Sequence, residues 1–596
     1  MRSTGLAPRC LWGAAAALAL QQGLGANLRD VRGGSVADVE KELGEKLVVG
    51  GQDAIEVLIT PPPLPEAVGQ TAPERWPAWP APPAIPQRPE CNASAPVTVR
   101  YATTTKRMYI ENVDRSGGCV DLSTVFELRK DSWSGAPLGG ARGPLWPVDP
   151  MTGERTPNIT GTWLLEEELY VEDGVTLNVW GGLDGDCDEL RIKSDNGTII
   201  NLRAHGANLY FRDTKVFGWD EELNAPRELY NSSTPRSYIS AVSEIITDPS
   251  ETCEGNAKSN MGEARMDIIN SEVAYLGYYD SESYGLTWWV RGFCQDKSNP
   301  EIFDDVNVYG DIINSDIHHN YFGMYTYGHL GGNWSYNKMH DNYQYGFDPH
   351  DDSDWLTIHN NEVWDNGNHG IIASKRCNHV SIQNNHVWGG GQAGLFLHRS
   401  TDFAIVKNNY VHDNADAGLA CLECFYANIY NNVFEHNKYG VRFSVGSMED
   451  WVHHNTFINS SRYNLYTYLG SDLPDVEGSD GRNNAIYFVE NYVYGNGASD
   501  GESIKLKQAD NCVFEGNMFE EAVSFRYDNS TETVMAGNTG TQNVEVSIQH
   551  GACFSSLSDV DPLWTPVCGD DGTDDGGDDD GDDDDGANDD AVEDED

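Results

Sequence analysis

Short runs of β-type residues alternate with asparagine-containing turns through the second half of the chain. From about Asp267 onward, an asparagine precedes a short apolar or aromatic pair at nearly constant intervals. These asparagines lie 23 or 24 residues apart, and an insertion separates them from Asn491 and Asn517: Asn314, Asn337, Asn361, Asn385, Asn409, Asn432 and Asn455. A unit of three short runs and three turns is too small to bury a core alone, so it must stack on its neighbours.

This repeat predicts an all-β fold, a right-handed parallel β-helix whose coils contain about 23–24 residues. A propeller, the competing repeat fold, needs about 40 residues per blade, and the shorter step excludes it. Asparagine suits the turns because it adopts the left-handed backbone conformation and hydrogen-bonds within its own turn. Stacked asparagines can also satisfy each other's amide groups.

Glycines at positions 323, 346, 370, 394, 418 and 440 each open the third run of a coil. Because successive side chains of a strand point to opposite faces, the first and third residues after each glycine are predicted to fill the core. The second and fourth face outward, and they include Tyr325, Tyr327, Asp348, His350 and His398. Stacked strands lie about 4.8 Å apart, which is close to the advance of one sugar in an extended polymer. The outward face therefore predicts a polysaccharide track.

The two ends of the chain depart from this repeat. Arg2 and Arg9 precede an apolar run that is too short to cross a bilayer and indicates a secretory signal. The proline-rich stretch from Pro61 to Pro89 is expected to be an extended spacer. We therefore predict four parts: a signal peptide (1–26), an N-terminal region with the proline-rich linker (27–90), the β-helix catalytic domain with an N-terminal elaboration (91–568) and an acidic disordered tail (569–596).

Composition narrows the compartment and the partners. The formal net charge is −55, and the tail supplies 17 of the acidic residues, which leaves −38 on the rest. So acidic a chain argues against nucleic acid as a partner, and no later apolar run reaches the length of a membrane span. Twelve cysteines, eleven without Cys10, predict several disulfides and a free thiol, with Cys421 and Cys424 structural as a disulfide or as buried thiols. Seven Asn-x-Ser/Thr sites fit a glycosylated secreted protein: Asn92, Asn158, Asn196, Asn231, Asn333, Asn459 and Asn529.

A group of cations stands beside the outward face of this acidic chain. Its members are predicted to form a positive stripe that holds carboxylates: Lys375, Arg376, Arg399 and Arg442. The implied substrate is a polyuronate. The alternative is that these cations pair with Asp351, Asp352 and Glu423.

A uronate carries one unusually removable proton, on C5 beside the carboxylate, and its abstraction requires a neutraliser, a base and an acid. His350 is the predicted base, because an imidazole is largely neutral near pH 7. Tyr345, at the turn into the same strand, is predicted to transfer a proton on the opposite sugar face. Asp348 is predicted to orient the imidazole or to share a proton with the substrate carboxylate. Lys375 and Arg376, one coil later, are the predicted neutralisers.

Adjacent carboxylates do not suit hydrolysis, because side chains of neighbouring residues diverge whereas a glycosidase pair flanks one bond. Asp351 and Asp352 are therefore interpreted as positioning groups or a cation site. Together with these two, six further residues are predicted to bind substrate: Tyr325, Tyr327, His369, His398, Arg399 and Arg442. No metal-ligand set is predicted. The Asp-Gly runs of the tail lack the spacing of a defined calcium loop, so they could gather Ca²⁺ only loosely, and Ca²⁺ stays open as a cofactor.

The segment from Tyr345 to Ser353, Tyr-Gly-Phe-Asp-Pro-His-Asp-Asp-Ser, resembles the mannuronan C5-epimerases, whose hallmark is Asp-Pro-His in a Tyr-Gly-x-Asp-Pro-His setting. The resemblance extends over roughly Asn201 to Tyr466, and it is greatest for the brown-algal branch of that family. Further segments look like the coils around the family's active site: Asn270 to Thr287, Tyr321 to Tyr327, His369 to Arg376 and Gly394 to Arg399.

The resemblance implies a β-helix enzyme that converts β-D-mannuronate to α-L-guluronate within alginate. It implies His350 and Tyr345 as the proton-transfer pair, Asp348 at the carboxylate site and a basic neutraliser on the next coil. Here Lys375 precedes Arg376, whereas bacterial members have arginine directly after the serine, so the neutraliser has two candidates. A polyuronate lyase and a non-catalytic wall-binding solenoid are the competing interpretations. We expect a secreted monomer of the extracellular matrix or cell wall that acts on polymannuronate.

Overall fold

The computed structural model describes residues 79–557 and 568, apart from 93, 113, 133–143, 196–197, 229–234, 245–261, 281, 292–302, 304–305, 496–502, 521–523, 541–544 and 558–567. Of two compact units, Met1–Glu66 and Ala67–Asp596, only the second contains described residues. The predicted signal peptide, the acidic tail and the sequons at Asn196 and Asn231 lie outside them. No helix of the described part is long and apolar enough to cross a membrane.

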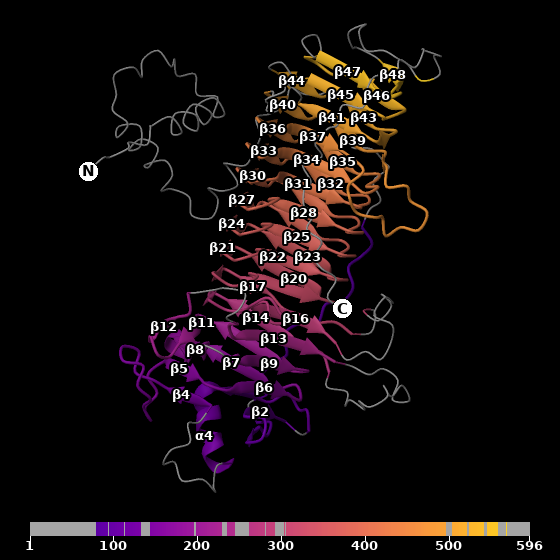
Figure 1. The fold of residues 1–596 in the computed structure, drawn as a ribbon. Helices are drawn as coiled ribbons and strands as arrows, with labels where there is room; N and C mark the ends of the chain where they lie inside the picture. The colour runs from indigo at the N-terminus through magenta and orange to yellow at the C-terminus, as the bar shows by residue number, and fades with distance from the viewer. Residues whose placement is uncertain are drawn as a thin grey trace, which may run out of the picture. The chain divides into compact units, whose positions relative to one another are not determined.

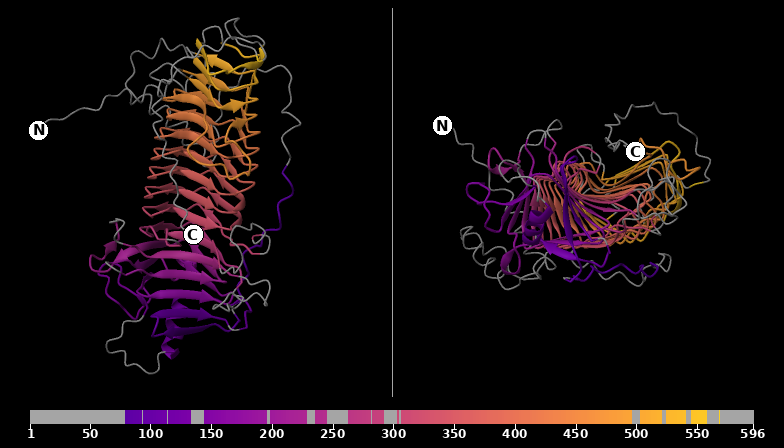
Figure 2. Two further views of the ribbon diagram at one scale, coloured as in Figure 1. Left: turned by 45° about the vertical axis from the view of Figure 1, so that its right-hand side comes forward. Right: turned by 90° about the horizontal axis from the view of Figure 1, so that it is seen from below.

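The described chain forms a right-handed parallel β-helix, as predicted, in which three sheets run along the stack of coils (Figure 1). We name them sheets A, B and C. Seen from below, the coils are displaced progressively, from the purple ones near the N-terminus to the orange and yellow ones near the C-terminus (Figure 2).

Sheet A contains, in order, β1 (Thr98–Ala102), β2 (Arg107–Glu111), β6 (Glu168–Glu172), β9 (Asn201–His205), β13 (Tyr238–Ser243), β16 (Leu286–Val290), β19 (Met324–Tyr327), β22 (Phe347–His350), β25 (Ile371–Ser374), β28 (Leu395–His398), β31 (Ala417–Leu422), β34 (Tyr439–Ser444), β37 (Tyr463–Thr467), β41 (Ile504–Lys507), β45 (Ser524–Asp528) and β47 (Glu545–Gln549).

Sheet B contains β3 (Cys119–Asp121), β7 (Thr176–Trp180), β10 (Asn208–Arg212), β14 (Arg265–Ile269), β17 (Ile312–Ile313), β20 (Leu330–Ser335), β23 (Asp354–His359), β26 (Ser381–Gln383), β29 (Ile405–Lys407), β32 (Asn428–Tyr430), β35 (Trp451–His453), β39 (Tyr487–Val489), β43 (Val513–Glu515), β46 (Thr533–Ala536) and β48 (Phe554–Leu557).

Sheet C contains β4 (Leu145–Pro147), β5 (Thr162–Leu165), β8 (Glu189–Lys193), β11 (Lys215–Asp220), β15 (Glu272–Ala274), β18 (Asp316–His318), β21 (Lys338–His340), β24 (Glu362–Trp364), β27 (His386–Trp388), β30 (Tyr410–His412), β33 (Val433–Glu435), β36 (Thr456–Ile458), β40 (Tyr492–Tyr494) and β44 (Met518–Glu520). β12 (Ala225–Pro226) pairs with β11, and β38 (Asn483–Asn484) pairs with β42 (Ala509–Asp510). Helix α4 (Leu122–Ser132) lies at the N-terminal end of the stack, where Val125 and Phe126 join the core, and η1 (Gly182–Asp184) follows β7.

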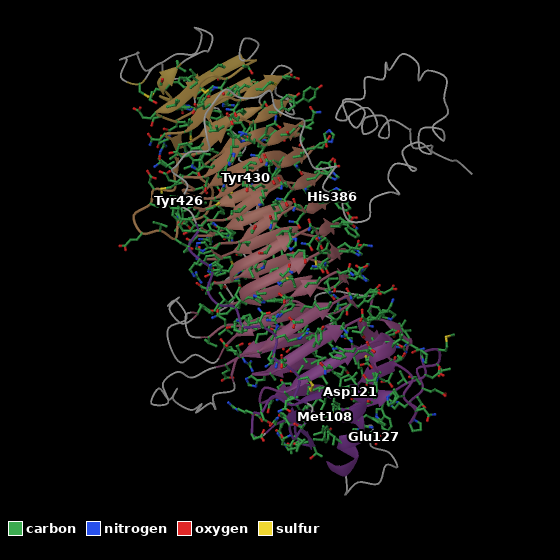
Figure 3. The ribbon with its side chains drawn as sticks, turned by 180° about the vertical axis from the view of Figure 1, so that it is seen from behind. Met108, Asp121, Glu127, His386, Tyr426 and Tyr430 are labelled. Atoms are coloured by element: carbon green, nitrogen blue, oxygen red, sulfur yellow. A yellow bond between two sulfur atoms is a disulfide. The ribbon has the colours of Figure 1, made fainter. Side chains whose placement is uncertain are left out.

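Side chains from each sheet point both into the core and away from it, as strand alternation requires. Figure 3, which views the solenoid from behind, shows Tyr430 on β32 and His386 on β27 at separate positions across its width. The core cluster contains the first residue after each landmark glycine, for example Met324 and Phe347, so the predicted inward set in sheet A is confirmed. The residues predicted to face outward lie outside this cluster, but most of them are buried too, and Tyr325, Ile372 and Phe396 belong to a second apolar cluster. The glycines allow close stacking, because a Cβ on Gly346 would lie 2.4 Å from the carbonyl oxygen of Gly370.

In each asparagine turn, one residue adopts the left-handed backbone conformation and the next is buried and makes the side-chain hydrogen bonds. Asn360 adopts the left-handed conformation (φ 56°), whereas Asn361 is buried. The Asn361 Oδ1 accepts the backbone N–H of Asn337 at 2.9 Å, and its Nδ2 donates to the Trp334 carbonyl at 2.9 Å. The same buried ladder continues through Asn385, Asn409, Asn432, Asn455, Asn491, Asn517 and Asn538.

The prediction that Asn314 belongs to this ladder is wrong by one residue, because Ser315 takes the buried position. Asn314 takes the left-handed position (φ 50°), and the backbone N–H of Ser315 donates to the Oδ1 of Asn337 at 2.9 Å. The mutual satisfaction of stacked amides is confirmed for the other members.

The described end of the proline-rich region, residues 79–91, forms no helix or strand, but it lies against the solenoid rather than leading freely to it (Figure 2, indigo segment beside the coils). We call it the strap. The Trp79 Nε1 donates to the Phe403 carbonyl at 2.9 Å, across 324 residues of sequence. Three further contacts follow: the Pro86 carbonyl with Arg265 Nη1 (3.2 Å), Arg88 over the Tyr210 ring (3.9 Å) and the Cys91–Cys119 disulfide.

A second disulfide joins Cys553 and Cys568. Five cysteines of the described part are free and buried: Cys187, Cys377, Cys421, Cys424 and Cys512. Of the two structural roles predicted for Cys421 and Cys424, the structure shows the buried thiols.

Candidate active site

Five of the charged residues predicted at the site occupy turns between sheets A and B: Asp351, Asp352, Lys375, Arg376 and Arg399. Each of these turns has two successive left-handed residues: Asp351 and Asp352, Lys375 and Arg376, and Arg399 and Ser400. The next residue fastens the turn, since Ser353 Oγ donates to the His350 carbonyl at 2.6 Å and Thr401 Oγ1 donates to the His398 carbonyl at 3.0 Å. This local geometry projects the side chains of the two turn residues outside the core.

His350 ends strand β22 on the outward face and is only 7% exposed. Its Nδ1 lies 2.6 Å from the Asp351 Oδ2, and the Tyr325 ring lies beside the imidazole at 5.4 Å between centroids. Burial by itself would raise the pKa of Asp351, but His350 and Arg376 together lower it below its ordinary value. The ionised Asp351 therefore selects the tautomer with a proton on Nδ1, which leaves the His350 Nε2 lone pair available as a base.

Asp348 lies two residues before His350, on the same face of β22. It is 1% exposed, and its Oδ1 has no hydrogen-bond partner among the described residues. Burial raises the pKa of Asp348 to about 7, with Asp351 raising it further while His350 and Lys375 lower it. The first of our two roles for Asp348, orienting the imidazole, is thus taken by Asp351. The second role stays a proposal, and a carboxyl that holds its proton near neutral pH suits it.

Three cations of the predicted stripe are held in ion pairs. Arg376 contacts Asp351 at 2.7 Å and Asp352 at 3.0 Å, as the alternative interpretation anticipated. Arg399 and Arg442 pair with other carboxylates: Asp472 (2.7 Å) and Asp475 (2.8 Å) for Arg399, and Asp416 (3.0 Å) for Arg442. These three arginines are thus paired with carboxylates of this chain, and their role in binding a substrate stays a prediction.

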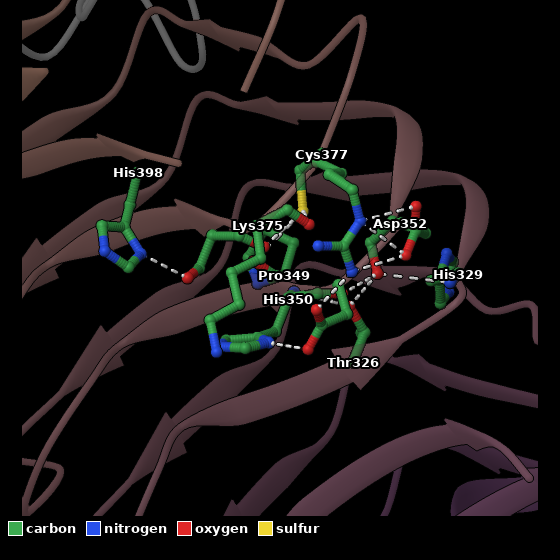
Figure 4. Close-up of polar contacts among 12 residues, drawn as sticks. Thr326, His329, Pro349, His350, Asp352, Lys375, Cys377 and His398 are labelled. Carbon is green, nitrogen blue, oxygen red and sulfur yellow. Dashed lines mark hydrogen bonds and ion pairs between the residues drawn. The ribbon is translucent and has the colours of Figure 1, made fainter. Parts of the chain in front are cut away.

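Lys375 lies next to Asp351 in the row of turns, because His350 pairs in register with Ser374. Figure 4 shows its side chain extending along the face toward His350. Its charge reaches three groups of the site, lowering the pKa of Asp348, of Asp351 and of His398. This is the position expected of a cation that acts on a group bound beside His350.

The other predicted histidines are neutral. Burial lowers the pKa of His369 to about 3, and its Nδ1 accepts the Ala393 N–H at 3.1 Å. Burial likewise holds the pKa of His398 well below its usual range, and its Nδ1 lies 2.7 Å from the Ser374 Oγ (Figure 4). Both are therefore suited to hydrogen bonding and packing, not to carrying charge.

Tyr345 precedes β22, at the opposite end of the strand from His350. Its ring is 6% exposed, lies parallel to His369 at 5.6 Å and meets the edge of Phe322 at 4.8 Å. Tyr345 and His350 can therefore approach a bound sugar from different ends of the same strand.

Sequence reasoning missed an aromatic wall on the preceding coils. Trp289 stacks on Tyr327 at 4.9 Å and on Tyr325 at 5.7 Å, and Tyr284 stacks on Phe322 at 4.5 Å. The signal was present, because Gly285 is one more landmark glycine and Trp289 is the fourth residue after it. With these rings included, the site combines an aromatic surface, a buried acid and a carboxylate-held imidazole. Within the described residues, no group of three or more His, Cys, Asp or Glu side chains is placed to hold a metal ion.

The chain is similar to one family model and to several curated proteins and solved structures. A family model described as periplasmic copper-binding protein (NosD) matches residues 294–471, well under half of the chain. A mannuronan C5-epimerase of Pseudomonas fluorescens is 28% identical over 184 residues, which cover 30% of this chain and 30% of that protein. The mannuronan C5-epimerase AlgG of Azotobacter vinelandii is 27% identical over 213 residues, 35% of this chain and 34% of that protein. The matches thus span about a third of the length of these curated relatives.

Among solved structures, the periplasmic alginate epimerase AlgG superposes with a TM-score of 0.51 at 18% identity, covering 74% of this chain and 85% of that chain. A mutant of the same protein gives a TM-score of 0.53 and covers 78% of this chain and 99% of that one. At this identity the likeness establishes the shared β-helix fold.

Proposed function

We propose that this chain is a mannuronan C5-epimerase, an isomerase that converts β-D-mannuronate to α-L-guluronate within polymeric alginate. One observation carries the proposal: His350, whose Nδ1 lies 2.6 Å from the Asp351 carboxylate, is on the same strand face as a buried Asp348 whose pKa is raised to about 7. The names of the curated relatives that match about a third of their length support it.

In the proposed reaction, His350 Nε2 removes the C5 proton of a mannuronate, and the electron pair of the C5–H bond moves into the adjacent carboxylate. Tyr345 then donates its phenolic proton to C5 from the opposite face, which inverts that carbon. The imidazolium and the phenolate return to their starting states by proton exchange with water. No bond of the polymer is broken, so the product is a guluronate within the same chain.

The dianionic intermediate needs its charge neutralised at the carboxylate. Lys375 is the proposed neutraliser, since its charge already acts on Asp348 and Asp351, while Arg376 spans Asp351 and Asp352. Asp348, in its protonated form, donates a hydrogen bond to one carboxylate oxygen. The aromatic wall of Tyr325, Tyr327 and Trp289 borders the reacting sugar on the preceding coils.

The decisive experiment is incubation of polymannuronate with the full chain in D₂O. Proton NMR follows guluronate and deuterium at C5, and ultraviolet absorbance follows unsaturated ends. We expect C5-deuterated guluronate without unsaturation. Unsaturated ends would favour the lyase, and neither signal would favour a binding protein.

The residue test uses His350→Gln, which we expect to abolish guluronate formation while polymannuronate still binds. His359→Gln is the matched control, because His359 lies on sheet B, where its ring hydrogen-bonds to Asn333 and Asn360 and lies against the Tyr336 ring. Full activity of the His350 variant would refute the assignment of the base.

We also propose a secreted location at the extracellular matrix or cell wall and a monomeric state, with polymannuronate as the partner. The Cys91–Cys119 and Cys553–Cys568 disulfides support an oxidising compartment.

A further inference from the structure

An insertion interrupts the coil repeat between β37 and β38, and its residues 468–482 form a loop beside the turns of the active-site face (Figure 1, orange loop at the right-hand edge). We call it the acidic loop. Its base is tied down by Asn483, whose Nδ2 donates to the Tyr468 carbonyl at 2.8 Å. Its tip is not anchored in the core, since Leu473 is 82% exposed.

The acidic loop is held to the preceding coils by polar contacts. Arg399 Nη2 lies 2.7 Å from the Asp472 Oδ2, and Arg399 Nη1 lies 2.8 Å from the Asp475 Oδ1. The Glu423 carboxylate accepts the backbone N–H groups of Asp475 (2.9 Å) and Val476 (2.8 Å). The loop, which follows β37, thus reaches back three coils to the turn after β28 and places two carboxylates on one guanidinium.

Arg399 belongs to the same row of turns as the catalytic residues. The strands pair in register from His350 to Ser374 and from Ser374 to His398, so the turn residues after them run Asp351, Lys375 and Arg399. Two strand spacings separate Arg399 from Asp351, which is about 10 Å along the solenoid. A uronate polymer that advances by roughly one sugar per coil would bring another carboxylate to Arg399 when its reacting sugar lies at His350.

From this geometry we infer that Asp472 and Asp475 are internal competitors for a substrate carboxylate, and that Arg399 forms a binding subsite that a long polyuronate must open. The inference rests on the proposed function. Chains that end before Arg399 bind without meeting the acidic loop, whereas longer chains displace its two carboxylates from the guanidinium. The loop therefore lowers the gain in affinity from chain length and makes this subsite sensitive to ionic strength, as expected for ion pairs that solvent reaches in part.

The test compares Asp472→Asn/Asp475→Asn with the unmodified chain by isothermal titration with oligomannuronates of defined length. For oligomers long enough to reach Arg399, we expect the double variant to bind about five- to tenfold more tightly, in line with the loss of two partly exposed ion pairs. Binding of the shortest oligomers should not change. In an Arg399→Gln background, the two asparagines should have no effect at any length.

Asp480→Asn is the matched control, because Asp480 lies in the same loop and accepts the backbone N–H of Arg482 instead of contacting Arg399. Equal affinities of the unmodified chain and the double variant for long oligomers would overturn the inference, as would an equal gain at every length. If the double variant does not fold, the single Asp475→Asn variant, whose aspartate side chain is 53% exposed, serves in its place. Guluronate formation by the unmodified chain, measured in parallel, reports on the proposed function separately from these affinities.

Discussion

Replacing Asp351 by asparagine removes the charge that holds His350 while keeping the size of the side chain. The Nδ1···Oδ2 contact is 2.6 Å long, and the two side chains are 8% and 16% exposed, so water screens the interaction little. A hydrogen bond to a charged group contributes about 1.5–3 kcal/mol, against about 0.5–1.5 kcal/mol for a neutral one. The asparagine amide can also present an N–H to the ring, which favours the wrong tautomer. We therefore expect kcat to fall about 10- to 100-fold, with KM nearly unchanged because the charge matters most once the imidazolium forms.

Asp352→Asn is the matched control, since Asp352 shares the turn and the Arg376 ion pair but does not contact His350 in the contacts described. Asparagine tolerates the left-handed backbone at both positions. The assay is the initial rate of guluronate formation by NMR at saturating polymannuronate, with thermal unfolding of each variant. We expect Asp352→Asn mainly to lower the melting temperature. A kcat for Asp351→Asn within about twofold of the unmodified chain would refute the reasoning, and so would equal losses in the two variants.

Two further predictions concern stability. Because burial raises the pKa of Asp348 to about 7, the folded chain keeps a proton that the unfolded chain releases near pH 4, so the free energy of unfolding should fall between about pH 4 and pH 7. Asp348→Asn should lose this dependence and gain about 4 kcal/mol over the unmodified chain by pH 8, measured by urea unfolding; parallel pH profiles would contradict it. Asn409→Ala removes the partner of two buried N–H groups of Asn385 and of the Ile382 carbonyl, so it should lower the free energy of unfolding by about 3–5 kcal/mol. Asn314→Gly is the control: it lies at an exposed left-handed turn and should change the free energy of unfolding by less than about 0.5 kcal/mol. A small effect at Asn409 would show that the ladder is not a main source of stability.

The fold was predictable because two independent periods agree. The 23-to-24-residue step gives the length of one coil, and the alternation after Gly346 or Gly370 separates inward from outward positions. Phe347 and His350 could therefore be assigned to opposite faces from the sequence alone. The error at Asn314 arose because asparagine serves both the left-handed position and the buried ladder, and only the hydrogen bonds distinguish the two.

The site was less predictable, because its decisive contacts depend on turn geometry and on distant residues. Strand alternation places Asp348 beside His350, but two successive left-handed residues swing Asp351 back onto the imidazole. The partners of Arg399 lie more than 70 residues further along the chain, in an insertion that the repeat does not describe. Burial sufficient to raise the pKa of Asp348 to about 7 is likewise a property of the stacked coils, not of the local sequence.

The strap has a consequence for the order in which parts of the protein fold during synthesis. Trp79 emerges from the ribosome early, yet the carbonyl that it binds belongs to Phe403, 324 residues later. At about 5–20 residues per second, translation takes roughly 15–65 seconds to supply that partner. Trp79 and its neighbouring prolines therefore cannot dock until the coils up to Phe403 have been synthesised and folded. A segment that is synthesised early is thus among the last to reach its final place. A ribosome-stalled chain that ends before residue 403 should leave Trp79 open to protease, and release of the complete chain should protect it.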